Sequence, residues 1–134
     1  MLYFAYGSNL HHFQMKRRCK DSFFIKKINL RHFRLTFRSK YRAADIELKK
    51  NSLVPGGLFE ISKSDEKKLD VYEDFPNLYK KYYFLHYGKK VMTYTMTKKT
   101  SFKFPTERYL NVVKQGYNDC GLDKKYLKKA LLQR

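Results

Sequence analysis

Apolar and aromatic residues alternate with polar ones in short runs over the first two thirds of the chain. A period of two residues is typical of β-strands, because successive side chains of a strand point to opposite faces of the sheet. Turn-forming residues bound each of these runs. We therefore expect strands at 2–6, 23–30, 32–37, 44–49 and 56–62, and a β-hairpin made of 79–88 and 89–97 around Gly88.

Four other segments carry the signals of helices. We expect these helices at 10–18, 62–73, 106–116 and 122–133. Ser8 or Asn9 can cap the free amides at the start of the first helix. The pattern Ser62-x-x-Asp65 resembles a capping box for the second, and Gly116 is expected to end the third.

The order of these elements predicts an α+β fold. Strands dominate the first two thirds and helices the end, which favours a small mixed β-barrel or a strongly curved sheet with helices packed outside. A chain of 134 residues is long enough for one core and too short for two, so we expect a single domain over 1–134. A hydrophobic content of 43%, with 12 Tyr and 11 Phe, is sufficient for that core.

The chain is strongly basic, with a formal net charge of +18. Basic residues recur in nearly every segment instead of gathering in one, which predicts weak, salt-dependent binding to polyanions without sequence preference. We expect no specific nucleic-acid partner, and a basic nucleic-acid-associated module remains the less favoured alternative function.

The sequence shows no secretory signal, and no stretch approaches the roughly 18 apolar residues that a membrane span requires. Cys19 and Cys120 lie far apart and have no neighbours at metal-ligand spacing. We expect both to be buried thiols of a cytoplasmic protein with no membrane partner.

A nucleophilic site is one candidate chemistry. Ser8 could be activated by His11 or His12, with Asp21 or Glu73 orienting the base. The chain lacks a G-x-S-x-G elbow, and adjacent histidines at the start of a helix are more typical of a solvated surface. This interpretation is therefore disfavoured.

Metal and nucleotide sites gain no support either. His11, His12 and Cys19 lack the spacing of a zinc site, so we expect no metal. The Gly-Ser-Asn turn lacks the glycines of a dinucleotide or triphosphate motif, so we expect no cofactor.

The turn itself and an acidic stretch at 69–79 remain as candidates. Free amides at the start of a helix can bind a carboxylate, and the small residues Gly7 and Ser8 let a ligand approach the main chain. Glu73 lies at the expected end of a helix, where desolvation by neighbours would raise its pKa for acid–base work. Those neighbours are Tyr72, Phe75, Pro76 and Tyr79. A surface glutamate at a helix end is the alternative.

A family resemblance joins these two features. The stretch LYFAYGSNL at 2–10 looks like the N-terminal signature of the gamma-glutamylcyclotransferase-like family. GGLFEIS followed by LDVYEDFPNLY resembles the strand and the segment that carry the catalytic glutamate of that family, and the stretch at 105–127 is similar to its closing helical pair. Two departures are Asp74, where the family usually has glycine, and RAADIELKK at 42–50, which lacks paired glycines.

The resemblance implies an enzyme that cleaves a γ-glutamyl amide by attack of the α-amine on the γ-carbonyl and releases 5-oxoproline. It implies that Glu73 transfers the proton and that the other site residues bind the γ-glutamyl group or line the cavity. Those residues are Tyr6, Gly7, Ser8, Asn9, Leu10, Tyr79 and Tyr109. Tyr79 and Tyr109 could equally be core residues.

Several functional points stay open at this stage. The leaving group could be an amino acid, the ε-amine of lysine, cysteinylglycine from glutathione or a biosynthetic amine. A non-catalytic member of the same fold, binding a γ-glutamyl or amino-acid ligand, is the alternative function. The chain is expected to be a monomer or homodimer.

Overall fold

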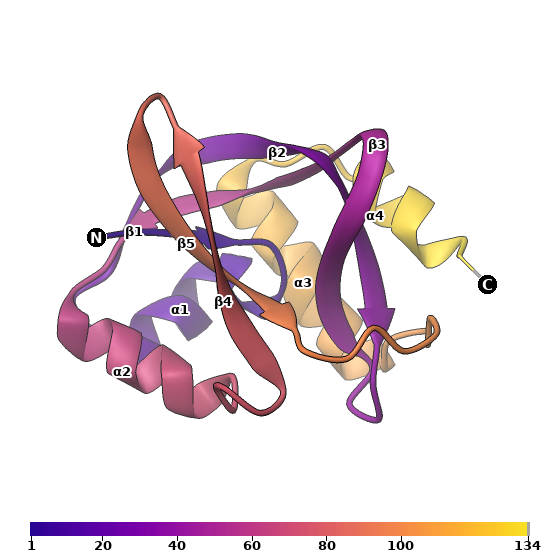
Figure 1. Cartoon of the computed structure of the whole chain (residues 1–134), viewed down its shortest axis with the longest axis horizontal. Coiled ribbons are helices and arrows are strands. Elements are labelled where there is room, and N and C mark those ends of the chain that lie inside the picture. Colours follow the sequence, from indigo (N-terminus) through magenta and orange to yellow (C-terminus); the bar gives the residue numbers. More distant parts are fainter. Residues whose placement is uncertain (134) are drawn as a thin grey trace.

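The computed structural model describes residues 1–133 and folds them around a five-stranded sheet of order β2-β3-β1-β5-β4 (Figure 1). The central strand β1 pairs parallel with β5 and antiparallel with β3. The strands are β1 (Leu2–Ala5), β2 (Phe23–Arg38), β3 (Ala43–Glu60), β4 (Tyr79–His86) and β5 (Lys89–Met96). The expected first strand and the β4–β5 hairpin are confirmed, and so is the α+β class with a curved sheet.

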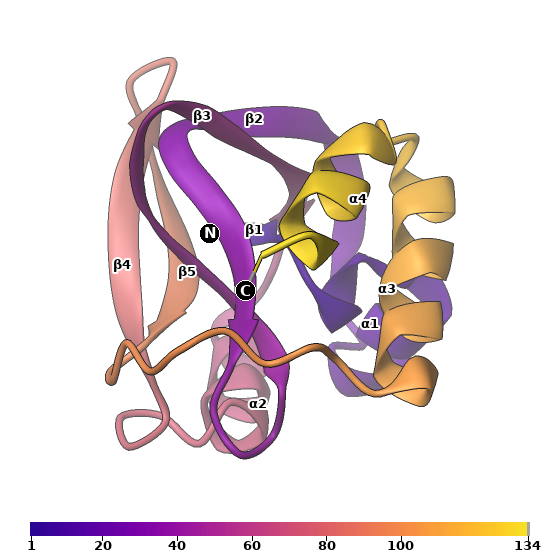
Figure 2. The same cartoon turned by 90° about the vertical axis from the view of Figure 1, so that its right-hand side faces the viewer.

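The helices surround this sheet. They are the 3-10 helix η1 (Ser8–Leu10), α1 (His12–Arg18), α2 (Lys63–Tyr72), α3 (Glu107–Cys120) and α4 (Lys125–Leu131). Figure 2 shows α1, α3 and α4 together on one side of the sheet and the β4–β5 hairpin on the other. Over residues 1–133, no helix combines the length and the apolar character that crossing a membrane needs. Cys19 and Cys120 are free, buried thiols, as expected.

The middle of the chain forms two long strands, where the sequence predicted four short ones. Between Arg31 and Phe33 the pairing of β2 with β3 shifts register by several residues, since Arg31 pairs with Leu53 and Phe33 with Leu48, so the expected break at that point is an irregularity within continuous strands. Within β3, Pro55 pairs with Asn29 instead of ending a strand. A Cβ on Gly56 would lie 2.4 Å from the Ala5 carbonyl oxygen, so this glycine permits close strand packing and does not mark a turn.

The first helix does not begin as predicted. The side chain that caps α1 is His11, whose Nδ1 accepts a hydrogen bond from the Gln14 amide (3.2 Å), so the prediction of Ser8 or Asn9 as the cap is wrong. Both of those side chains accept hydrogen bonds from the Arg18 guanidinium instead. The capping box of α2, made by Ser62 and Asp65, is present as predicted.

The third helix runs past Gly116 and ends before Gly121, which adopts a left-handed conformation (φ +68°). The prediction that Gly116 ends the helix is therefore wrong. A Cβ on Gly116 would lie 2.4 Å from the Leu10 Cβ and 2.8 Å from the His11 amide nitrogen. This glycine lets α3 pack closely against η1, and this contact fixes the position of the loop at residues 7–10 relative to α3.

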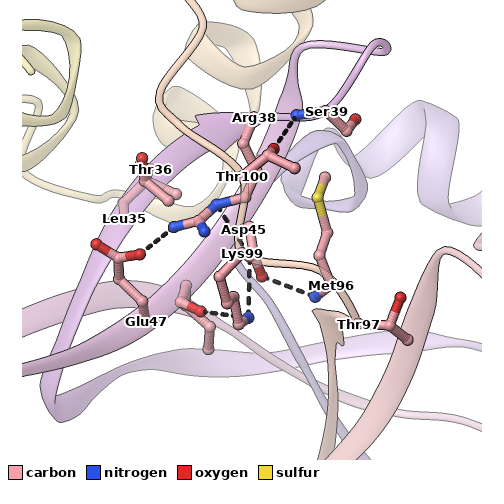
Figure 3. A network of polar contacts seen from close by, with 12 residues as sticks. Leu35, Thr36, Arg38, Ser39, Asp45, Glu47, Met96, Thr97, Lys99 and Thr100 are labelled. Carbon is pink, nitrogen blue, oxygen red and sulfur yellow. Dashed lines mark hydrogen bonds and ion pairs between the residues drawn. The ribbon is translucent and has the colours of Figure 1, made fainter. Parts of the chain in front are cut away.

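A buried carboxylate joins the first half of β3 to the end of β5 (Figure 3). Asp45 is fully buried, and its Oδ1 accepts a hydrogen bond from the Met96 amide (2.9 Å). Its Oδ2 lies 3.3 Å from Arg38 Nε and 3.0 Å from Lys99 Nζ. Because β1 ends at Ala5, β3 and β5 are not separated by a strand at this level, and Asp45 draws them together.

The contact at Gly116 gives the first prediction. Gly116→Ala should lower the free energy of unfolding by roughly 1–3 kcal/mol, the usual cost of overpacking. In an unobstructed helix the same change would raise it by about 0.5–1 kcal/mol. Urea unfolding measures the difference, with Asn111→Ala at an exposed position of α3 as the control. A more stable Gly116→Ala variant would contradict the packing described here.

Candidate active site

A cavity of about 450 Å³ opens where β1 ends. Its walls come from the loop after β1, the start of β3, the α2–β4 connection, β5 and the first turn of α3. Of the eight residues expected at the site, seven line this cavity: Tyr6, Gly7, Ser8, Asn9, Glu73, Tyr79 and Tyr109. The eighth, Leu10, does not line it: its side chain lies in the core and its amide donates to the Gly7 carbonyl.

The loop at residues 7–10 turns its main chain tightly. The Leu10 amide donates to the Gly7 carbonyl (3.1 Å), and the His11 amide donates to the Ser8 carbonyl (3.2 Å). Within residues 1–133, the amides of Ser8 and Asn9 have no such acceptor. Two main-chain donors beside the cavity are therefore free to bind a ligand.

Two tyrosines hold the main chain of one residue, Ala44, in the opposite wall. The Tyr79 hydroxyl donates to the Ala44 carbonyl (2.6 Å), and the Tyr109 hydroxyl accepts from the Ala44 amide (3.1 Å). Tyr79 and Tyr109 therefore combine features of both predictions. They line the cavity, as site residues would, and their hydroxyls form hydrogen bonds with the main chain, as those of core residues do. A Cβ on Gly7 would come within 3.0 Å of the Ala44 Cβ and 3.1 Å of the Tyr109 hydroxyl, so the two walls approach each other here.

Glu73 caps the C-terminal end of α2, and its amide donates to the Leu69 carbonyl (2.8 Å). Its carboxylate forms no hydrogen bond or ion pair with any side chain or main-chain group of residues 1–133. Burial raises the pKa of this carboxyl to about 7, while the positive charge of Arg18 acts in the opposite direction. Glu73 therefore exchanges its proton near neutral pH.

The tyrosines around Glu73 remain neutral. Burial raises the pKa of Tyr3, Tyr6, Tyr79 and Tyr109 above its ordinary value, and the negative charge of Glu73 adds to the effect. The Tyr6 hydroxyl donates to the Tyr94 carbonyl (2.6 Å), which fixes its ring at the base of the cavity. The tyrosines therefore form the walls of the cavity and donate or accept hydrogen bonds, whereas Glu73 is the group that can exchange a proton near neutral pH.

The alternative nucleophilic site is not assembled. Ser8 Oγ accepts a hydrogen bond from Arg18, and His11 caps α1. His12 Nε2 lies 3.4 Å from a buried thiol sulfur, and Asp21 accepts a hydrogen bond from a serine hydroxyl at the start of α2. Over the described residues, no three His, Cys, Asp or Glu side chains gather in a way that could hold a metal ion.

The family model described as "Gamma-glutamyl cyclotransferase, AIG2-like" matches residues 3–115. The chain belongs to this family. The comparison with curated proteins finds no match.

Solved structures of the same fold accompany that match. One described as gamma-glutamyl cyclotransferase has a TM-score of 0.81 at 24% identity, covering 100% of this chain and 88% of its own. The human uncharacterized protein loc79017 has a TM-score of 0.80 at 25% identity, covering 99% and 87%. YkqA from Bacillus subtilis has a TM-score of 0.78 at 21% identity, covering 98% and 54%. These likenesses support the cyclotransferase-like fold.

Both departures from the family pattern have a structural explanation. Asp74 has a left-handed backbone (φ +51°), a conformation that glycine adopts freely and that aspartate tolerates better than most residues. In the segment that lacks the paired glycines, Ala43 and Ala44 line the cavity, and their small side chains leave room for the Gly7 wall. Neither departure closes the cavity.

Eight of the fifteen lining residues were not among the predicted site residues, although Tyr72 was expected beside Glu73. The eight are Tyr3, Tyr41, Ala43, Ala44, Tyr72, Asp74, Leu78 and Tyr94. The alanine pair carried a signal, since two small residues open a strand that faces the glycine of the loop. Tyr3 and Tyr94 carried none, because alternation along a strand does not tell the wall of a cavity from the core.

The raised pKa of Glu73 predicts a pH-dependent cost of folding. The folded state holds this proton up to about pH 7, whereas the unfolded chain releases it near 4.5, so stability is lost as pH rises from 4.5 to 7. Glu73→Gln should therefore raise the free energy of unfolding at pH 8 by up to roughly 3 kcal/mol, and by much less at pH 4.5.

Urea unfolding at the two pH values measures this effect. Glu107→Gln, at an exposed position of α3, is the control and should show no comparable gain at pH 8. Equal effects of Glu73→Gln at both pH values would show that burial does not destabilise the ionised carboxylate.

Proposed function

We propose that this chain is a cyclotransferase that converts γ-glutamyl amides into 5-oxoproline and a free amine. The observation that carries the proposal is the unpaired Glu73 carboxyl, with a pKa of about 7, in a cavity bordered by two free amides. Membership of the family supports the same reaction class. In this proposal the γ-glutamyl group lies between the loop at residues 7–10 and the wall that contains Ala44.

Glu73 takes a proton from the substrate before the ring can close. At neutral pH the α-amine is mostly an ammonium ion with no lone pair for attack, and an ionised Glu73 can accept its proton. The neutral amine then attacks the γ-carbonyl carbon, which forms the new C–N bond of the lactam. The free amides of Ser8 and Asn9 stabilise negative charge on the carbonyl oxygen, an effect worth roughly 3–4 kcal/mol per well-placed donor.

The same glutamate completes the reaction. The leaving nitrogen departs as a neutral amine when it receives the proton that Glu73 holds, and the original amide C–N bond breaks. The ionised Glu73 then accepts the surplus proton of the ring nitrogen, which leaves the neutral lactam, and releases it to solvent. A pKa near 7 suits both steps, since the carboxyl is neither too weak a base nor too weak an acid at neutral pH. No water is consumed, and the cavity contributes by holding the amine close to the carbonyl.

Loss of the titrating group tests this mechanism. Glu73→Gln keeps the shape of the side chain but cannot accept a proton, so turnover should fall by roughly 10²- to 10⁴-fold. Wild-type kcat/KM should rise with pH through about 7, where Glu73 ionises. Both the loss of turnover and the pH dependence are measured by mass spectrometry of the 5-oxoproline released from a panel of γ-glutamyl compounds. Glu107→Gln is the control.

Binding separates the cyclotransferase from a non-catalytic member of the family. In NMR titrations 5-oxoproline should shift the amides of the loop at residues 7–10 in both wild type and Glu73→Gln. Loop shifts without turnover in the wild type would favour a binding protein. A folded Glu73→Gln variant with wild-type turnover would refute the mechanism.

Asp74 should influence the choice of leaving group. It borders the cavity next to Glu73 and carries a negative charge at an exposed position. Asp74→Gly suits the left-handed backbone and removes that charge, so turnover should persist while substrates with an anionic leaving group gain relative to neutral ones. Asp74→Asn separates the effect of charge from that of the backbone. Unchanged relative kcat/KM values in both variants would exclude this role.

A further inference from the structure

Arg18, the last residue of α1, touches the cavity from outside. Its Nη1 donates to Asn9 Oδ1 (2.5 Å) and lies 3.3 Å from Ser8 Oγ. Its guanidinium carbon lies 3.3 Å from the centre of the Tyr72 ring, and Nη2 donates to the Tyr72 hydroxyl. Arg18 therefore contacts three residues that line the cavity.

Within residues 1–133 no carboxylate lies within ion-pair distance of this arginine, although the charge of Glu73 acts on it from farther away. Its hydrogen-bond partners are neutral oxygens. Burial lowers the pKa of Arg18, yet a guanidinium keeps its proton at any physiological pH. A half-buried cation without an anion is costly unless a ligand supplies one.

Arg18 also lines a second cavity of about 260 Å³, while its contacts with Ser8, Asn9 and Tyr72 join it to residues of the first. The second cavity is lined by Gln14, Arg17 and Arg18. The Gln14 side-chain amide donates to the Ser8 carbonyl (3.0 Å), so one residue that lines this cavity is bonded to the loop at residues 7–10. Two guanidinium groups and an amide are the groups that recognise a carboxylate.

The position of this cavity indicates which part of the substrate it meets. The base of the first cavity is closed by buried rings, including those of Tyr3 and Tyr94. Its exposed lining residues are Tyr41, Asp74 and Tyr72, and Tyr72 (49% exposed) forms the part of the rim beside Arg18. If the γ-glutamyl group lies inside, as proposed above, the amine being released must point toward the rim. Arg18 then lies on its path.

We propose that Arg18 and Arg17 form a subsite for a carboxylate on the leaving amine. This inference rests on the proposed function and narrows its substrate class to γ-glutamyl derivatives of amino acids or short peptides. Neutral alkylamines fit the same reaction but leave the guanidinium groups without an anion. Arg18 acts here on substrate choice, while Glu73 acts on the proton.

A matched pair of substrates tests the subsite. γ-Glutamylalanine and γ-glutamylethylamide share the glutamyl half and differ only in the carboxylate of the leaving amine. Wild type should prefer the alanine compound in kcat/KM. Arg18→Gln should reduce this preference by roughly 10- to 100-fold, the range of a lost charge-assisted hydrogen bond. Arg18→Lys should retain part of it, and Arg17→Gln should weaken it less.

The ratio of the kcat/KM values for the two substrates separates an effect on the subsite from an effect on folding. A variant that merely disturbs the loop lowers both reactions together, which leaves the ratio unchanged and would overturn the proposal. Lys20→Gln removes one positive charge just beyond α1, outside both cavities, and should keep the wild-type ratio. A wild type without preference for the alanine compound would also overturn it.

Failure of the proposed function gives a different result. If neither compound yields 5-oxoproline, the dissociation constants of both are measured for wild type and Arg18→Gln by calorimetry. Tighter binding of γ-glutamylalanine that depends on Arg18 supports the subsite without catalysis. Equal affinities for the two compounds refute it. Arg17→Gln, at an exposed residue, provides the same comparison if Arg18→Gln does not fold.

Discussion

The buried carboxylate of Asp45 joins segments that are distant in the sequence. It accepts a hydrogen bond from Met96 at the end of β5 and lies against Arg38 of β2 and Lys99 beyond β5 (Figure 3). Burying a charge without partners costs several kcal/mol, so these segments are held together or the carboxylate is unpaired. Because Asp45 follows Ala44 directly, the same constraint places the peptide that faces the loop at residues 7–10.

The site combines three features that each cost the folded chain stability. Glu73 is desolvated and unpaired, Asp74 has a left-handed backbone, and Arg18 has no carboxylate within ion-pair distance among residues 1–133. All three features lie around one cavity. Asp45 is also a buried carboxylate, but it has three partners, which distinguishes a structural charge from a reactive one.

Local patterns predicted the parts of the structure that depend on local interactions. The β4–β5 hairpin, the capping box of α2 and the position of Glu73 at the end of that helix all follow from neighbouring residues. The continuity of β3 through Pro55, and of α3 through Gly116, depends on what packs against each residue from elsewhere in the chain. The same holds for Arg18, whose place beside the cavity arises only when α1 folds back against the loop.

The net charge of +18 does not explain the chemistry by itself, although it affects the site. Exposed charges are largely screened beyond about 8–10 Å at physiological salt, so most of the lysines contribute little to the pKa of Glu73. Arg18 lies close and partly buried, and it opposes the desolvation that raises that pKa. An anionic ligand that neutralised Arg18 would weaken this opposition and raise the pKa of Glu73 further. A carboxylate on the leaving amine would thus favour the protonated glutamate at the stage when that amine needs a proton.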